Sequence, residues 1–96
     1  MIHNQSSQKL VDDVIAVLKT YDIKKASLFG SYVRGENGKD SDLDILVELP
    51  KGNSLLDLVR LERKLEEALG KKVDVVTYKS VNPLLKEYIR EQYRIL

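Results

Sequence analysis

The chain has 96 residues, of which 43% are hydrophobic and 32% charged, which suits one compact globular domain and excludes a disordered or membrane-embedded protein. Sixteen basic and fifteen acidic residues give a formal net charge of +1, too small for the field that an extended grip on nucleic acid needs. Because there is no cysteine, thiolate metal sites are excluded, and any metal would be held by oxygen ligands, as magnesium is.

The first part of the chain predicts a helix followed by a strand. Residues 1–7 contain neither a basic leader nor an apolar run, so we expect a flexible start and a cytoplasmic protein with no membrane span. Over residues 8–21 the apolar side chains recur every three or four positions, which predicts an amphipathic helix behind Ser6 and Ser7 as possible N-caps. Residues 25–29 are then a short strand candidate.

The middle of the chain predicts a second strand after two irregular segments. Gly30 and Ser31 end the first strand, and one helical turn over residues 32–34 is followed by a polar loop over 36–41. Residues 43–49 are rich in the apolar types found in strands, and a proline follows them directly.

The last part predicts helix, strand and helix. Ser54 and Gly70 are the expected N-cap and C-cap of a second amphipathic helix. Val73–Thr77 is a third short strand, a last helix is expected over 82–89, and the apolar residues near the C-terminus are expected to cover the core. Helices interleaved with a small mixed β-sheet of at least three strands predict one α/β or α+β domain that spans the whole chain.

Three aspartates are candidates for a metal site. Asp42 and Asp44 are two residues apart at the start of a strand, so their carboxylates would project from one face about 6–7 Å apart. Asp74 opens the last predicted strand and has valines as its neighbours. Packing in an apolar core does not explain a carboxylate at this position. If the two strands pair, the three side chains form a platform for two magnesium ions about 3.5–4 Å apart, which favour in-line displacement at phosphorus.

A candidate phosphate-binding turn precedes this platform. Gly30 and Ser31 lie between a strand and a helical turn, where backbone N–H groups and the positive end of a helix face an anion. Glycine permits close approach, the serine hydroxyl donates a hydrogen bond, and Arg34 is one turn further on. Asp-x-Asp or Gly-Ser alone is common at loops and strand ends; their joint spacing is what indicates a site.

These motifs resemble a known signature. Gly-Ser, ten residues and then Asp-x-Asp within GSYVRGENGKDSDLDILVEL is similar to the signature of the DNA polymerase β-like nucleotidyltransferases. With KKVDVVTY and NPLLKEYI, the chain from Lys25 onward resembles the minimal nucleotidyltransferases, including MntA-type antitoxins of HEPN–MNT pairs. The resemblance implies the polymerase β-like palm fold.

The resemblance also implies roles. Asp42 and Asp44 would ligate both magnesium ions, Asp74 would ligate the ion next to the attacking hydroxyl and help to deprotonate it, and the phosphate turn would bind the triphosphate. AMP would pass from ATP to a hydroxyl of a partner, taken as a tyrosine of a HEPN ribonuclease toxin in a hetero-oligomer. Two alternatives stay open: a non-catalytic binding antitoxin with a regulatory nucleotide site, and transfer to a small molecule, which the short chain disfavours.

Overall fold

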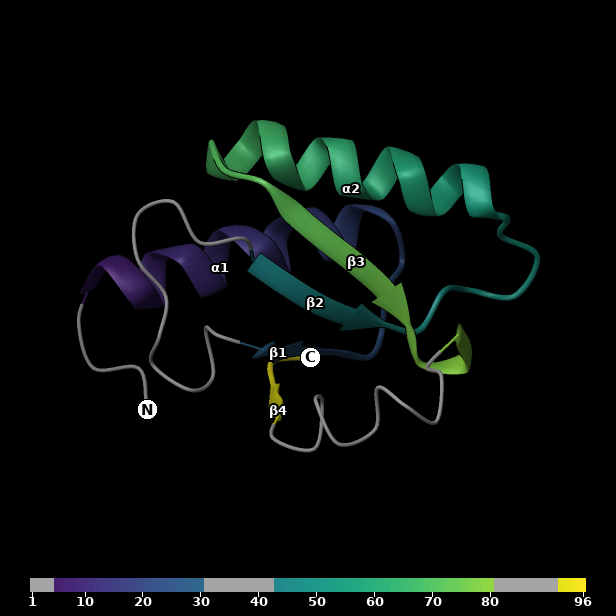
Figure 1. The fold of residues 1–96 in the computed structure, drawn as a ribbon, viewed down its shortest axis with the longest axis horizontal. Helices are drawn as coiled ribbons and strands as arrows, with labels where there is room; N and C mark the ends of the chain where they lie inside the picture. Colours follow the sequence, from purple (N-terminus) through teal and green to yellow (C-terminus); the bar gives the residue numbers. More distant parts are fainter. Residues whose placement is uncertain (1–4, 31–42, 81–91) are drawn as a thin grey trace.

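The computed structural model describes residues 5–30, 43–80 and 92–96, and these contain a mixed four-stranded sheet and two helices (Figure 1). The strand order is β3-β2-β1-β4. This confirms the expected α+β class, with four strands where at least three were predicted. The elements in chain order are α1 (Gln5–Thr20), β1 (Ala26–Phe29), β2 (Leu43–Val47), α2 (Leu55–Leu69), β3 (Val73–Thr77), the 3-10 turn η2 (Tyr78–Ser80) and β4 (Gln92–Arg94).

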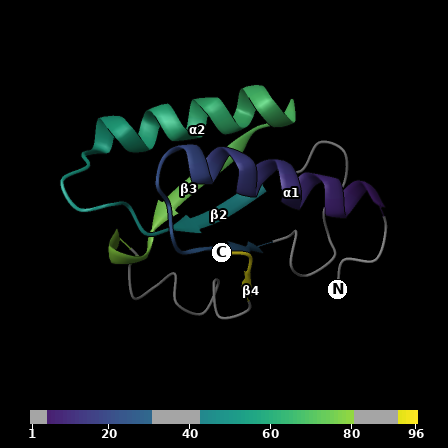
Figure 2. The same cartoon turned by 180° about the vertical axis from the view of Figure 1, so that it is seen from behind.

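Both helices lie on one face of the sheet. β2 and β3 are parallel neighbours joined through α2, whereas β1 runs antiparallel to both β2 and β4. In Figure 1 the strands lie in front of α1, and in Figure 2, seen from behind, α1 lies in front of the strands. Among the described elements, no helix covers the opposite face, which we call the open face.

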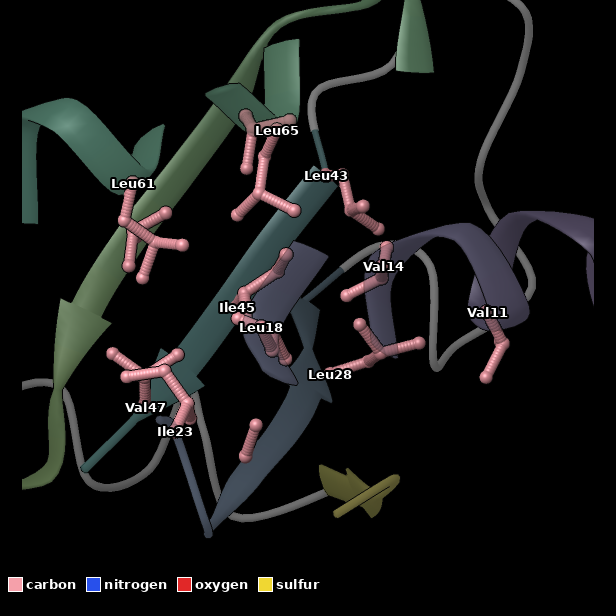
Figure 3. Close-up of a cluster of buried hydrophobic side chains, with 13 residues drawn as sticks. Val11, Val14, Leu18, Ile23, Leu28, Leu43, Ile45, Val47, Leu61 and Leu65 are labelled. Carbon is pink, nitrogen blue, oxygen red and sulfur yellow. The ribbon is translucent and has the colours of Figure 1, made fainter. Parts of the chain in front are cut away.

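The main core fills the space between the two helices and the sheet (Figure 3). Its alternate strand residues point toward the helices, as the two-residue period of a strand requires. Its members include residues of α1, α2, β1, β2 and β3. Several of them are fully buried: Val14, Leu18, Leu28, Leu43, Ile45, Val47, Leu61 and Leu65.

A smaller cluster stabilises the open face. Phe29 and Leu46 are buried there and pack against the half-buried Val76 and Tyr78. The hydroxyl of Ser27, itself fully buried, shares a hydrogen bond of 2.8 Å with the Tyr78 hydroxyl. The open face is therefore packed in its middle by apolar side chains and closed at one end by a polar pair.

Both predicted caps of α2 are confirmed. The backbone N–H of Ser54 donates to the carboxylate of Asp57 at 2.9 Å, which satisfies a donor at the helix start. Gly70 has φ +67° and donates its N–H to the carbonyl oxygen of Glu66 at 2.9 Å. A left-handed conformation of this kind favours glycine because no Cβ clashes with the backbone.

Four element boundaries differ from the sequence-based expectation. α1 begins at Gln5 and ends at Thr20 instead of spanning 8–21, so Ser6 and Ser7 lie within the helix and not before it. β1 begins at Ala26 and β2 ends at Val47, one and two residues inside the predicted strands. Helix and strand ends are set by hydrogen bonds to neighbouring segments, which local patterns do not reveal.

The C-terminal residues form a strand that the sequence did not predict. β4 pairs with β1, and the Ala26 N–H donates to the carbonyl oxygen of Leu96 at 3.0 Å. Ile95 and Leu96 pack against the main core, as expected for the apolar end of the chain. The expected turn at 32–34, loop at 36–41 and helix at 82–89 lie outside the described residues. Neither α1 nor α2 is long and apolar enough to cross a bilayer.

Candidate functional site

The sheet register brings Asp44 and Asp74 together. These two residues are register partners in the parallel β2–β3 pair, and Phe29 at the end of β1 is the partner of Asp44. Their chain neighbours Ile45 and Val75 point into the main core, so strand alternation places both carboxylates on the open face. Adjacent strands are about 4.8 Å apart, so the two side chains start as close neighbours.

This pair has the chemistry of a cation site. Asp44 is half-buried and Asp74 is exposed. Like charges directly opposite each other destabilise a sheet, whereas oxygen donors from two carboxylates suit a hard divalent cation such as magnesium. Within residues 5–30, 43–80 and 92–96 no group of three possible ligands occurs. Asp42, the expected third member, lies outside the described residues.

Gly30 lies beside this pair because it directly follows Phe29, the β1 partner of Asp44. It is buried and has φ +76°, a backbone conformation that favours glycine. The structure therefore brings three of the six predicted site residues, Gly30 with Asp44 and Asp74, to one end of three adjacent strands. The other members of the predicted phosphate turn, Ser31 and Arg34, lie outside the described residues.

Sequence reasoning missed one feature next to this site. Two glutamates of α2 accept hydrogen bonds from the outer edge of β3: Glu66 from the Val73 N–H at 3.1 Å, and Glu62 from the Val75 N–H at 3.3 Å. The acidic pair four residues apart on α2 was visible in the sequence. Its target was not, because the contact depends on how α2 packs against β3.

Sequence comparisons show the family of the chain. The family model described as a nucleotidyltransferase domain matches residues 11–96. A protein of Methanocaldococcus jannaschii, named provisionally as a protein adenylyltransferase, is 58% identical over 76 residues, which cover 79% of this chain and 82% of the relative. The protein adenylyltransferase MntA of Thermococcus cleftensis is 43% identical over 72 residues, which cover 74% of this chain and 73% of the relative.

Solved structures share the fold. A structure identified provisionally as a minimal nucleotidyltransferase is 36% identical with a TM-score of 0.76, and the match covers 92% of this chain and 91% of that one. A toxin–antitoxin structure with AMP-PNP has a TM-score of 0.78 at 26% identity, covering 90% of this chain and 72% of the matched chain. The chain therefore belongs to the nucleotidyltransferase domain family, among the minimal nucleotidyltransferases of the MntA type.

Proposed function

We propose that the chain is a magnesium-dependent adenylyltransferase that moves AMP from ATP to a tyrosine hydroxyl of a partner protein, and that the partner is a HEPN ribonuclease toxin neutralised by this modification. The observation that carries the proposal is the β2–β3 register, which pairs Asp44 with Asp74 on the open face. Relatives named as protein adenylyltransferases and the similarity to a toxin–antitoxin structure with AMP-PNP support it.

The residues of the site take separate roles in this reaction. Two magnesium ions held by Asp44, Asp74 and the predicted ligand Asp42 would supply positive charge at the phosphates and at the acceptor oxygen. Gly30 offers its backbone N–H to the triphosphate, with Ser31 as a further donor and Arg34 reaching a phosphate oxygen.

The transfer itself is a displacement at the α-phosphorus. The acceptor oxygen forms a bond to the α-phosphorus, and the bond from that phosphorus to the bridging oxygen breaks, so that pyrophosphate leaves with the electron pair. Asp74, the exposed member of the described pair, would lie next to the acceptor and take up the proton of the hydroxyl.

The exposure of Asp74 favours an acceptor that is itself a protein. Because Asp74 is exposed, a hydroxyl carried on another macromolecule can approach it. Such a partner would form a hetero-oligomer with this chain, in the cytoplasm, where ATP is available.

Mass spectrometry tests the proposal directly. The chain is co-expressed with the protein that copurifies with it, and the partner's intact mass is measured for wild type, for Asp44→Asn/Asp74→Asn and for Asp42→Asn/Asp44→Asn. We expect the wild type to add whole adenylyl groups to partner tyrosines, and neither double variant to add any. Asp12→Asn is the matched control, because Asp12 is exposed on α1 and accepts a hydrogen bond from the Gln8 side chain at 2.9 Å.

The two alternative functions predict different results for the same variants and for the chain incubated with its partner and labelled ATP. Partner neutralisation by the double variants without any modification would replace the enzyme with a binding antitoxin. Label from α-labelled ATP that appears in a small molecule and not in the partner would indicate the small-molecule reaction. Transfer of label from the γ-phosphate alone would indicate a kinase and refute the mechanism.

A further inference from the structure

β3 is an edge strand whose outer side is occupied by carboxylates. Among the described strands it pairs only with β2, so its outward N–H groups lack the strand partners that an inner strand has. Glu66 accepts from the Val73 N–H at 3.1 Å and Glu62 from the Val75 N–H at 3.3 Å. We call these two hydrogen bonds the edge clamp.

The spacing of the two glutamates along α2 matches the spacing of the two N–H groups along β3. Four residues along a helix advance about 6 Å, and two residues along a strand advance about 6.7 Å, so carboxylates at positions i and i+4 can reach N–H groups at positions j and j+2. The later glutamate meets the earlier valine because α2 and β3 run in opposite directions. The left-handed Gly70 makes that reversal just after α2 ends.

The clamp lies on both sides of Asp74 along the strand. The Lys72 carbonyl accepts from the Leu43 N–H at 3.0 Å, so the backbone groups of residue 72, and by alternation those of Asp74, face β2. The groups of Val73 and Val75 face outward, where the glutamates hold them. Asp74 is thus fixed by β2 on one side and, through its two neighbours, by α2 on the other.

We propose that Glu62 and Glu66 are positioning residues for Asp74. They fix the position and twist of β3 relative to β2, so that the Asp74 carboxylate stays beside that of Asp44. This inference rests on the proposed function of Asp74 as a metal ligand. A purely protective role for the clamp, which would only shield the sheet edge from pairing with other chains, predicts no effect on metal binding.

Three variants separate these roles. Glu62→Ala/Glu66→Ala removes both acceptors, and Glu62→Gln/Glu66→Gln keeps an acceptor oxygen at each position without its charge. Glu67→Ala is the matched control, because Glu67 lies on the same helix, is exposed and forms an ion pair with Lys64 at 4.0 Å. The readouts are amide hydrogen exchange of Val73 and Val75 by NMR, calorimetric affinity for magnesium with AMP-PNP, and the magnesium dependence of adenylyl transfer to the copurifying partner.

We expect the double alanine variant to lose amide protection at Val73 and Val75 and to bind magnesium with AMP-PNP roughly tenfold more weakly, the usual range for groups that orient metal ligands being about 10–100-fold. Transfer should need correspondingly more magnesium. The glutamine variant should recover most of the affinity, and Glu67→Ala should match wild type. If the double alanine variant does not fold, Glu62→Ala and Glu66→Ala are measured singly, and each should show a smaller loss.

Five results would overturn the inference. Unprotected Val73 and Val75 amides in the wild type would mean that the clamp does not form in solution. Lost protection with wild-type magnesium affinity would leave only the protective role, and an equal loss in the glutamine variant would show that charge matters and not the hydrogen bond. If Asp74→Asn binds and transfers as wild type does, the proposed function itself fails; if only Asp74→Asn is defective, the positioning role alone fails.

Discussion

Replacing Gly30 with alanine tests whether the turn beside Asp44 binds phosphates, and Gly52 provides a matched control. Both glycines have positive φ, +76° and +92°. Gly52 lies in the turn between β2 and α2, beyond the end of β2 that is remote from Asp44, and a Cβ added there would meet nothing within 4 Å. Alanine in a left-handed conformation costs about 1–2 kcal/mol, and each kcal/mol lowers Tm by about 4–8 °C in a domain of this size.

We therefore expect both variants to lose thermal stability, with Gly30→Ala losing at least as much because Gly30 is buried. Only Gly30→Ala should lose nucleotide affinity. Alanine keeps the backbone N–H, but its Cβ disfavours φ +76°, so the substitution should move that N–H away from the phosphate. Because a hydrogen bond to a charged group contributes about 1.5–3 kcal/mol, the Kd for AMP-PNP with magnesium, measured by calorimetry, should rise about 10–100-fold. Gly52→Ala should bind as wild type does. Equal affinities in two folded variants would show that Gly30 does not contact the triphosphate.

Two further predictions concern stability and are measured by urea unfolding. Leu61→Ala should lower the free energy of unfolding by about 2–5 kcal/mol because Leu61 is fully buried, whereas Leu56→Ala should change it by no more than about 0.5 kcal/mol because Leu56 is 58% exposed on the same helix. Tyr78→Phe should cost about 1–3 kcal/mol by leaving the buried Ser27 hydroxyl without its partner, and more than Ser27→Ala, because the half-buried Tyr78 hydroxyl can bind water. The double variant should cost less than the two single costs together; strict additivity would argue against the pair.

Local signals in the sequence predicted the elements that depend on local chemistry. Ser54 and Gly70 mark the ends of α2 because each cap is formed by that residue's own backbone and a neighbour within four positions. Val73–Thr77 was predicted with its observed bounds because β-branched residues dominate it. Asp44 was likewise placed on a strand by the apolar run of residues 43–49.

Non-local features were less accessible. β4 was missed because its three residues are all exposed and its identity as a strand comes from pairing with β1, more than sixty positions earlier. The prediction that Asp44 and Asp74 lie close together depended on the pairing of their two strands, which no local pattern specifies. The edge clamp was missed for the same reason, since Glu62 and Glu66 resemble any solvated acidic pair until the position of β3 is known.

Strand alternation connects the stability of the core to the geometry of the site. Ile45 and Val75 are only 0% and 7% exposed, and each lies next to one of the paired aspartates. A slip of one residue in either strand would turn an aspartate into the core and an apolar side chain out of it. An unpaired buried carboxylate costs several kcal/mol, and exposing an isoleucine or valine forfeits about 1.5–3 kcal/mol more. The core therefore fixes the register before any ligand binds. Asp74→Asn, which removes one of two like charges, should accordingly abolish transfer while leaving the protein at least as stable as wild type.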